Sequence, residues 1–337
     1  MKGSGVGRAE VIRVVTFVRG EERAGELPRG GVVTIGNYDG IHRGQRAVLD
    51  GVVARAREIG APALVVTFDP HPLAVLDPPR APQRIASDAQ RERLFAAAGV
   101  DAVWVVPFTA EFARRPAADF VRDLLVDRLG VREVHVGSRF GFGRARGGNL
   151  ELLERMGAEH GFAVRGVPEL DNGGEPISST RIRAALAAGE VEKAAALLGR
   201  PFARGGRVVA GDHLGRRIGW PTANLAADTE LLPAHGVYAA KLRRLEESGP
   251  ALTGVANVGV RPTRGGDAAP RVEIHLFDFD AELYGEEVEI EFHHRLRGER
   301  RFPSLDALAE QIAADAAAAR EYFSGPGRSG ESAGGRI

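Results

Sequence analysis

The chain has 337 residues, a length that suits two domains of ordinary size. Hydrophobic residues make up 44% and charged residues 27%, as in a globular protein. Its 45 basic and 45 acidic residues cancel, which argues against a nucleic-acid binder because such proteins carry a basic excess. The absence of cysteine excludes disulfides, thiolate metal sites and cysteine nucleophiles. We find no signal-peptide-like or membrane-spanning apolar run, and expect a cytoplasmic protein with no membrane partner.

In the first half of the chain, apolar strands alternate with amphipathic helices. The pattern predicts strands over 32–35, 63–68, 102–108, 133–137 and 163–168, and helices over 45–60, 118–129 and 149–161. Ser87 and Gln90 have the spacing of a capping box that opens a further helix. Such alternation implies right-handed crossovers and a parallel sheet. Ligands of these sheets bind beyond the carboxyl ends of the strands.

After about residue 198, strands follow one another without helices between them. We predict them over 206–210, 237–242, 252–257, 272–279 and 287–294. Ser304 caps a final helix that carries Leu305, Leu308, Ile312 and Ala316 on one face. Short strands with one terminal helix predict a small closed antiparallel β-barrel. The Gly/Ser/Arg-rich tail, 324–337, is predicted to be disordered.

The stretch 36–45 follows a predicted strand and opens a helix. Its glycines would let the backbone approach a phosphate, and the helix N-terminus offers N–H groups and a positive dipole end. His42 can donate a hydrogen bond to a phosphate oxygen. The alternative interpretation is an ordinary tight turn with a solvated histidine.

A second polar segment, 177–183, places hydroxyl groups immediately before a helix. Serine or threonine would serve well there as a plain helix cap. The alternative is a triphosphate site, in which Arg183 adds a positive charge one turn into the helix. The residues alone support both interpretations equally.

These two motifs, with Thr67–Pro72 and Gly219–Leu225, follow one another in a recognisable order. From Val32 to Phe323 the chain resembles the prokaryotic bifunctional riboflavin kinase/FMN adenylyltransferase family, also called FAD synthetase. The resemblance implies a Rossmann-like nucleotidylyltransferase domain over 1–186, followed by a β-barrel kinase domain over 187–323. It also implies riboflavin, FMN and ATP as small-molecule substrates, with Mg²⁺ as the cofactor.

The kinase half matches the family pattern closely. The resemblance implies a catalytic base at Glu273, which would accept the proton of the attacking alcohol. It implies Mg²⁺ ligands at Thr222 and Asn224, whose hard oxygens suit that ion. The same comparison assigns Gly211, Gly215, Arg216, Pro221, Thr222 and Asn224 to nucleotide binding, and Asn257 and Arg297 to the flavin site. Without the resemblance, Glu273 would be an ordinary outward residue of an alternating strand.

The adenylyltransferase half departs from the family at two positions. Gln45 stands where the HxGH motif has its second histidine, and Arg139 stands where an acidic or amide residue is expected. The matching nucleotide-binding positions are Gly36, Asp39, His42, Gly44, Ser179, Thr180 and Arg183. Adenylyl transfer needs positive charge around the α-phosphate, and Gln45 is neutral. Arg139 could supply the missing charge.

Three hypotheses follow from this pattern. The first is an active riboflavin kinase joined to an adenylyltransferase domain of weakened or altered activity. The second is a fully bifunctional FAD synthetase in which Arg139 compensates for the lost histidine. The third is a non-catalytic flavin-binding paralogue. The intact set of Thr222, Asn224 and Glu273 argues against the third, because a pure binder has no need of a base.

Overall fold

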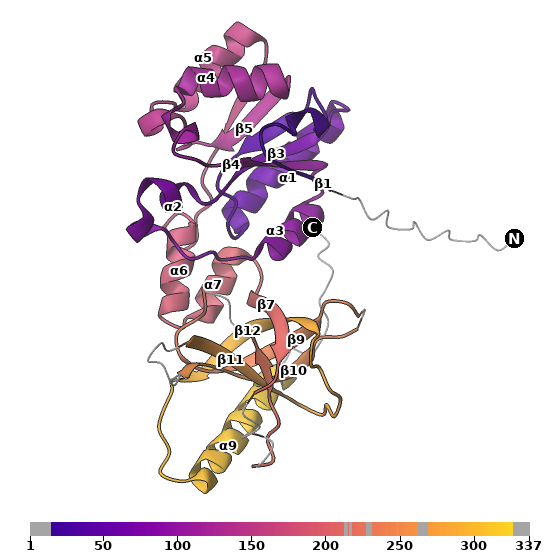
Figure 1. Cartoon of the computed structure of the whole chain (residues 1–337), viewed down its shortest axis with the longest axis vertical. Helices are drawn as coiled ribbons and strands as arrows, with labels where there is room; N and C mark the ends of the chain where they lie inside the picture. The colour runs from indigo at the N-terminus through magenta and orange to yellow at the C-terminus, as the bar shows by residue number, and fades with distance from the viewer. Residues whose placement is uncertain are drawn as a thin grey trace, which may run out of the picture. The chain divides into compact units, whose positions relative to one another are not determined.

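The computed structural model describes residues 15–211, 215, 218–226, 231–247, 249–261 and 269–325 (Figure 1). The chain forms two compact units. The first comprises Met1–Pro82 and Arg91–Asp171, and the second comprises Gln83–Gln90 and Asn172–Ile337. Arg216 and residues 326–337 of the predicted tail lie outside the described residues.

A six-stranded parallel sheet forms the centre of the first unit, in the order β1-β4-β3-β2-β5-β6. This confirms the predicted parallel α/β fold. The strands are β1 (Thr16–Arg19), β2 (Val32–Ile35), β3 (Ala63–Asp69), β4 (Ala102–Pro107), β5 (Glu133–Gly137) and β6 (Ala163–Val167). The prediction missed the edge strand β1, which is four residues long and buries only Val18 fully.

Helices cover both faces of this sheet, so each strand contributes alternate side chains to two cores. Val32 and Val65 pack in the core that holds Leu49 of α1, whereas Val33 and Val66 pack in the other core. The helices are α1 (Arg43–Glu58), α2 (Pro72–Leu76), α3 (Asp88–Ala98), α4 (Ala117–Phe120) and α5 (Leu150–His160). The predicted helix over 118–129 is α4, continued by a π-helical segment, η4 (Val121–Arg128). Single 3₁₀ turns are η1 (Ala24–Glu26), η2 (Pro78–Arg80), η3 (Phe112–Arg114) and η5 (Arg144–Arg146).

The second unit contains a closed antiparallel barrel in the order β10-β11-β8-β7-β12-β9, as predicted. Its strands are β7 (Phe202–Val209), β8 (Ala223–Leu225), β9 (Gly236–Arg244), β10 (Leu252–Arg261), β11 (Ala269–Leu276) and β12 (Glu287–Arg297). The three-residue strand β8 was not predicted. It closes the barrel between β7 and β11.

Two short helices, α6 (Ser179–Ala187) and α7 (Val191–Leu198), pack with this barrel. Ile182 and Leu186 of α6 are fully buried in the same hydrophobic cluster as Phe202 and Phe292. Helix α6 therefore belongs to the second unit, and the division between the units falls at Asp171, ahead of the predicted boundary at residue 186.

The C-terminal helix α9 (Leu305–Ser324) lies against the barrel (Figure 1). The predicted cap is present, because the N–H of Ala307 donates to Ser304 Oγ at 3.1 Å. Ala319 and Phe323 pack in a cluster with Val237 and Val255 of the barrel wall. This cluster is separate from the barrel interior, so α9 covers the outer surface of β9 and β10.

Candidate active site

Four of the predicted kinase residues lie in one row around the barrel. Asn224 of β8 pairs with Glu273 of β11, and Glu273 pairs with Asn257 of β10. Asn257 then pairs with Val237 of β9, and Val237 pairs with Arg297 of β12. Residues directly opposite each other in an antiparallel sheet project from the same face. The register alone therefore brings these side chains to one level on one side of the barrel wall.

This row faces the outside of the barrel. The residues that follow or precede it along the strands, Ile274, Ala256 and Tyr238, are buried in the barrel interior. Side chains alternate along a strand, so Glu273 and Asn257 point outward, to the side that α9 covers. Glu273 is thus an outward residue of an alternating strand, and the outward side here faces a cavity.

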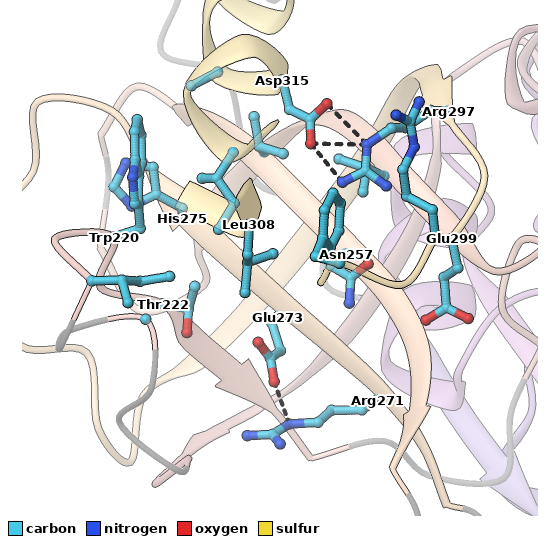
Figure 2. A pocket seen from close by; sticks show the side chains of 18 of the residues that line it. Trp220, Thr222, Asn257, Arg271, Glu273, His275, Arg297, Glu299, Leu308 and Asp315 are labelled. Carbon is cyan, nitrogen blue, oxygen red and sulfur yellow. Dashed lines mark hydrogen bonds and ion pairs between the residues drawn. The ribbon is translucent and has the colours of Figure 1, made fainter. Parts of the chain in front are cut away.

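The cavity has a volume of about 330 Å³ and is shown in Figure 2. Thr222, Asn224, Asn257, Glu273 and Arg297 of the predicted set line it, together with Gly215. The other lining residues are Ile218, Trp220, Val237, Val255, Arg271, His275, Glu299, Arg300, Phe302, Leu308, Ile312, Asp315 and Ala316. The cavity therefore combines apolar walls with a small number of polar groups, as small-molecule sites do.

Asn224, Glu273 and Arg271 form one polar cluster in this cavity. The Nε of Arg271 donates to Asn224 Oδ1 at 2.8 Å and forms an ion pair with Glu273 Oε1, also at 2.8 Å. The Nη2 of Arg271 also donates to Asn224 Oδ1. Asn224 is 5% exposed, whereas the Glu273 side chain is 30% exposed and open to the cavity. Glu273 is therefore the accessible carboxylate of the cluster.

A second ion pair lies near α9. Arg297 donates to both carboxylate oxygens of Asp315, with Nη2 at 2.8 Å from Oδ2 and Nε at 3.0 Å from Oδ1 (Figure 2). The Asp315 side chain is 6% exposed and also accepts from Gln311 Nε2 at 2.8 Å. Arg297 is thus fixed by the helix rather than extended into the cavity. Val237 and Leu308 line the apolar wall of the same cavity.

The backbone near Thr222 is held by a histidine. His275 Nδ1 donates to the Pro221 carbonyl at 2.8 Å, and its ring meets Trp220 edge-on at 4.9 Å between centroids. At Gly211, an added Cβ would collide with the Asn224 side chain. Pro221 and Gly211 therefore act on the cavity through backbone position rather than through side-chain groups.

Sequence reasoning missed Arg271, His275 and Asp315. A signal existed for the first two, because residues two apart on a strand share a face and both flank Glu273 at that spacing. Asp315 follows Leu308 by seven residues and Ile312 by three, so it is an acid on the apolar face of a predicted helix. The sequence did not reveal their partners, which come from other elements.

In the first unit, the loop after β2 lies at a topological switch point. Strand β2 pairs with β3 on one side and with β5 on the other, so the chain reverses direction across the sheet there. Tyr38 anchors the loop that contains Gly36 and Asp39. Its hydroxyl bonds to Thr34 Oγ1 at 2.7 Å, and its carbonyl accepts from Arg91 Nε at 2.8 Å. Burial raises the pKa of the Tyr38 phenol, which therefore stays protonated.

His42 and Gln45 form a reciprocal capping box at the start of α1, whose first turn includes Gly44. The Gln45 N–H donates to His42 Nδ1 and the His42 N–H donates to Gln45 Oε1, each at 3.2 Å. Because Nδ1 accepts, a neutral His42 carries its hydrogen on Nε2. Gln45 Nε2 donates to the Asn37 carbonyl at 2.7 Å. The residue that replaces the family histidine is thus used to build the helix start.

Arg139 pairs with Glu169, with Nε donating to Oε1 at 2.8 Å, and its side chain is 69% exposed. Ser178 is the N-cap of α6 and accepts from the Arg181 N–H at 3.3 Å, so Ser179 and Thr180 occupy the first turn. Arg183 Nε donates to the Gln83 carbonyl at 2.8 Å. These α6 residues belong to the second unit, and His42 and Gln45 belong to the first.

The first unit places a helix N-terminus at the switch point of its sheet, which suits a phosphate. The second unit places a carboxylate and an amide in one cavity. Both kinds of site suit a nucleotide-using transferase. Comparison with protein families supports this class. Residues 25–181 match the FAD synthetase family model, and residues 198–323 match the riboflavin kinase model. The first match includes Ser179 and Thr180.

Whole-chain relatives carry both regions. The bifunctional riboflavin kinase/FMN adenylyltransferase of Escherichia coli K12 is 43% identical over 308 residues, which is 91% of this chain and 97% of that protein. The Pseudomonas fluorescens protein of the same name is 43% identical over 90% of this chain and 96% of its own length. The chain therefore belongs to the bifunctional riboflavin kinase/FMN adenylyltransferase family.

A solved structure shares the whole fold. The crystal structure described as a macrolide-efflux protein from Streptococcus pneumoniae has a TM-score of 0.82 and 31% identity, covering 91% of this chain and 99% of that one. Within the described residues of our chain, no helix has the length and apolarity needed to cross a membrane.

Proposed function

We propose that the second unit is a riboflavin kinase, which transfers the γ-phosphate of ATP to riboflavin and releases FMN and ADP. The observation that carries this proposal is the row of Asn224, Glu273, Asn257 and Arg297 on one cavity wall. Four different strands, β8, β10, β11 and β12, place these residues together. Family membership over 91% of the chain supports the same assignment.

In the proposed reaction, the primary hydroxyl oxygen of riboflavin forms a bond to the γ-phosphorus, and the bond from that phosphorus to the ADP oxygen breaks. Glu273 accepts the hydroxyl proton, because it is the accessible carboxylate of the polar cluster. Apolar residues such as Val255 and Leu308 line the cavity and suit a flat aromatic ring. The Arg297–Asp315 pair would border the flavin as a fixed polar edge.

The residues present fit a magnesium ion that arrives with the nucleotide. Thr222 and Asn224 offer neutral oxygens, and Mg²⁺ commonly takes few protein ligands beside phosphates and water. The described residues include no cluster of three or more His, Cys, Asp or Glu side chains able to hold a metal. Thr222 and Asn224 would hold the ion, which when bound neutralises charge on the phosphates. ATP is the co-substrate, and the cytoplasm, which supplies it, is the compartment we propose.

For the first unit we propose an FMN adenylyltransferase-type site of weakened activity. Such a site joins the FMN phosphate to the α-phosphate of ATP and releases pyrophosphate. His42 with its Nε2 hydrogen is a suitable donor at the start of α1. Gln45 is neutral, and its amide is bonded to His42 and Asn37. Arg139 forms an ion pair with Glu169. This pairing argues against the hypothesis that Arg139 supplies the charge of the missing histidine.

The test is to incubate the full chain with riboflavin and Mg-ATP and to separate riboflavin, FMN and FAD by chromatography. We expect FMN as the main product with little FAD. Abundant FAD would support the fully bifunctional enzyme instead. Unchanged riboflavin would overturn the kinase assignment and favour a non-catalytic flavin binder.

A further inference from the structure

Arg271 holds both candidate groups of the kinase cluster at once. It lies two residues before Glu273 on β11, so both side chains leave the same face of the strand. Its guanidinium lies against the Glu273 carboxylate (Figure 2) and donates to Asn224 Oδ1 through both Nε and Nη2. The Arg271 side chain is only 20% exposed. Arg271 is therefore a partly buried residue of the cavity wall and not a surface arginine.

The bonds of Arg271 conflict with a metal at Asn224. An amide oxygen has two acceptor sites, and both face N–H groups of the same guanidinium here. The fixed positive charge of Arg271 also repels a divalent cation, and partial burial strengthens that repulsion. A metal ion can therefore coordinate Asn224 Oδ1 only after Arg271 has released it.

We infer that Arg271 is an internal competitor of the divalent cation, which holds Asn224 and Glu273 until nucleotide phosphates draw the guanidinium away. This inference rests on the proposed kinase function of the cavity. Arginine forks readily onto phosphate oxygens, so an incoming nucleotide offers Arg271 new acceptors while the metal takes over Asn224. Metal and nucleotide binding are then coupled, and the metal alone binds weakly.

Removing the competitor should separate the two binding events. In Arg271→Gln the metal no longer has to displace charge-assisted hydrogen bonds, so we expect its affinity without nucleotide to rise about tenfold. When ADP is bound, Arg271 has already released Asn224, so the metal affinity of the ADP complex should change little in this variant. The factor by which ADP strengthens metal binding should therefore fall by about the same tenfold. Arg271→Lys keeps the charge without the fork, and we expect a smaller gain.

The experiment uses the full chain and Mn²⁺ as a paramagnetic stand-in for Mg²⁺, with bound metal measured by electron paramagnetic resonance. Each variant is titrated with and without ADP, and the signal lost in Asn224→Ala defines the cavity site. The matched control is Arg207→Gln, which breaks an exposed arginine–glutamate pair elsewhere on the barrel, with Arg207 Nε 3.0 Å from Glu287 Oε1. Its Mn²⁺ affinity should equal that of the wild type.

An Arg271→Gln variant that melts like the wild type and binds Mn²⁺ no more tightly would overturn the inference. If that variant does not fold, Arg271→Lys decides: a gain in metal affinity supports the competitor, and no gain refutes it. FMN formation by the wild-type chain is measured in parallel. If the wild-type chain forms no FMN, the kinase assignment is refuted. If it forms FMN normally but Arg271→Gln binds Mn²⁺ no more tightly than the wild type, only the role of Arg271 is refuted.

Discussion

The barrel cavity and the loop after β2 differ in how each uses its polar residues. In the cavity, Glu273 and Asn224 come from neighbouring strands and meet through sheet register and Arg271. In the loop, His42 and Gln45 are three residues apart, and their bonds to each other build the first turn of α1. The cavity keeps an accessible carboxylate, whereas the amide of Gln45 is used for helix capping.

This difference shows why a motif match alone does not establish activity. A side chain that caps a helix is fixed in place, and a neutral amide there provides no charge to a transition state. A strand residue has its backbone satisfied by the sheet, so its side chain remains available for chemistry. We therefore expect substitution of Glu273 to lower the activity of the cavity, and substitution of Gln45 by histidine to raise the activity of the first unit.

The largest expected effect is on the cavity. Glu273→Gln removes the proposed proton acceptor but keeps the shape of the side chain, so FMN formation should fall by about 10³-fold. ATP binding should stay near the wild-type value, because the loss affects the chemical step. Single-turnover kinetics and nucleotide titration measure the two quantities. Glu287→Gln, an exposed glutamate of β12, is the control. Unchanged turnover in Glu273→Gln would remove it from the mechanism.

The second prediction concerns which residues the barrel needs in order to fold. A fragment of residues 172–337 should be more stable than one of residues 187–337 by about 2–5 kcal/mol, because the shorter fragment lacks the buried Ile182 and Leu186. Urea denaturation of both fragments measures the difference. Equal stabilities would show that α6 is dispensable for the barrel and would favour the boundary at residue 186.

A smaller gain is expected in the first unit. Gln45→His should raise FAD formation from FMN and ATP by about tenfold, since it restores a group that can carry charge, although it also breaks the capping box. Gln45→Ala is the control, because it breaks the box without adding an imidazole and should give no gain.

Arg139→Ala distinguishes a weakened adenylyltransferase site from a fully bifunctional enzyme in which Arg139 compensates for the missing histidine. We expect unchanged FAD formation, because Arg139 is exposed and paired with Glu169. Strong FAD synthesis by the wild-type chain that is lost in Arg139→Ala would restore the compensation hypothesis.

The last prediction concerns a pH dependence of stability. Burial raises the pKa of Glu133, but hydrogen bonds from Arg55 and His135, both at 2.8 Å, outweigh burial and leave its pKa below the ordinary value. The unfolded state therefore binds a proton at higher pH than the folded state. The stabilisation is present above about pH 4.3 and is lost as the pH falls through the folded-state pKa.

Glu133→Gln should thus lower the free energy of unfolding by about 1.5–3 kcal/mol at pH 7, and the difference should shrink toward zero in acid. Trp104 fluorescence in a Trp220→Phe background would follow the first unit alone. Glu291 of the barrel has longer bonds, 3.3 Å to Arg243 and 3.2 Å to His293. Glu291→Gln, followed by Trp220 fluorescence in a Trp104→Phe background, should show a smaller difference. A pH-independent difference at Glu133 would contradict this explanation.

Composition and side-chain periodicity predicted the fold class and most of the helices and strands. Strands β2 and β5 have the predicted bounds, and the predicted caps at Ser87 and Ser304 are present. These features depend on local rules, namely side-chain periodicity and hydrogen bonds to the first turn of a helix. The resemblance to a family, carried by local motifs, also pointed to the cavity residues before the structure placed them together.

Which residues share a site follows from the packing of the whole chain and could not be predicted from local sequence. The row from Asn224 to Arg297 depends on strand register around a closed barrel, and pairing between distant segments leaves no local signal. The bond between Arg271 and Asn224 spans 47 residues, and Asp315 reaches Arg297 from a helix. Helix α6 belongs to the unit of the barrel because its apolar face is buried in the barrel's hydrophobic cluster. The sequence of α6 shows that it has an apolar face but not which unit that face packs against.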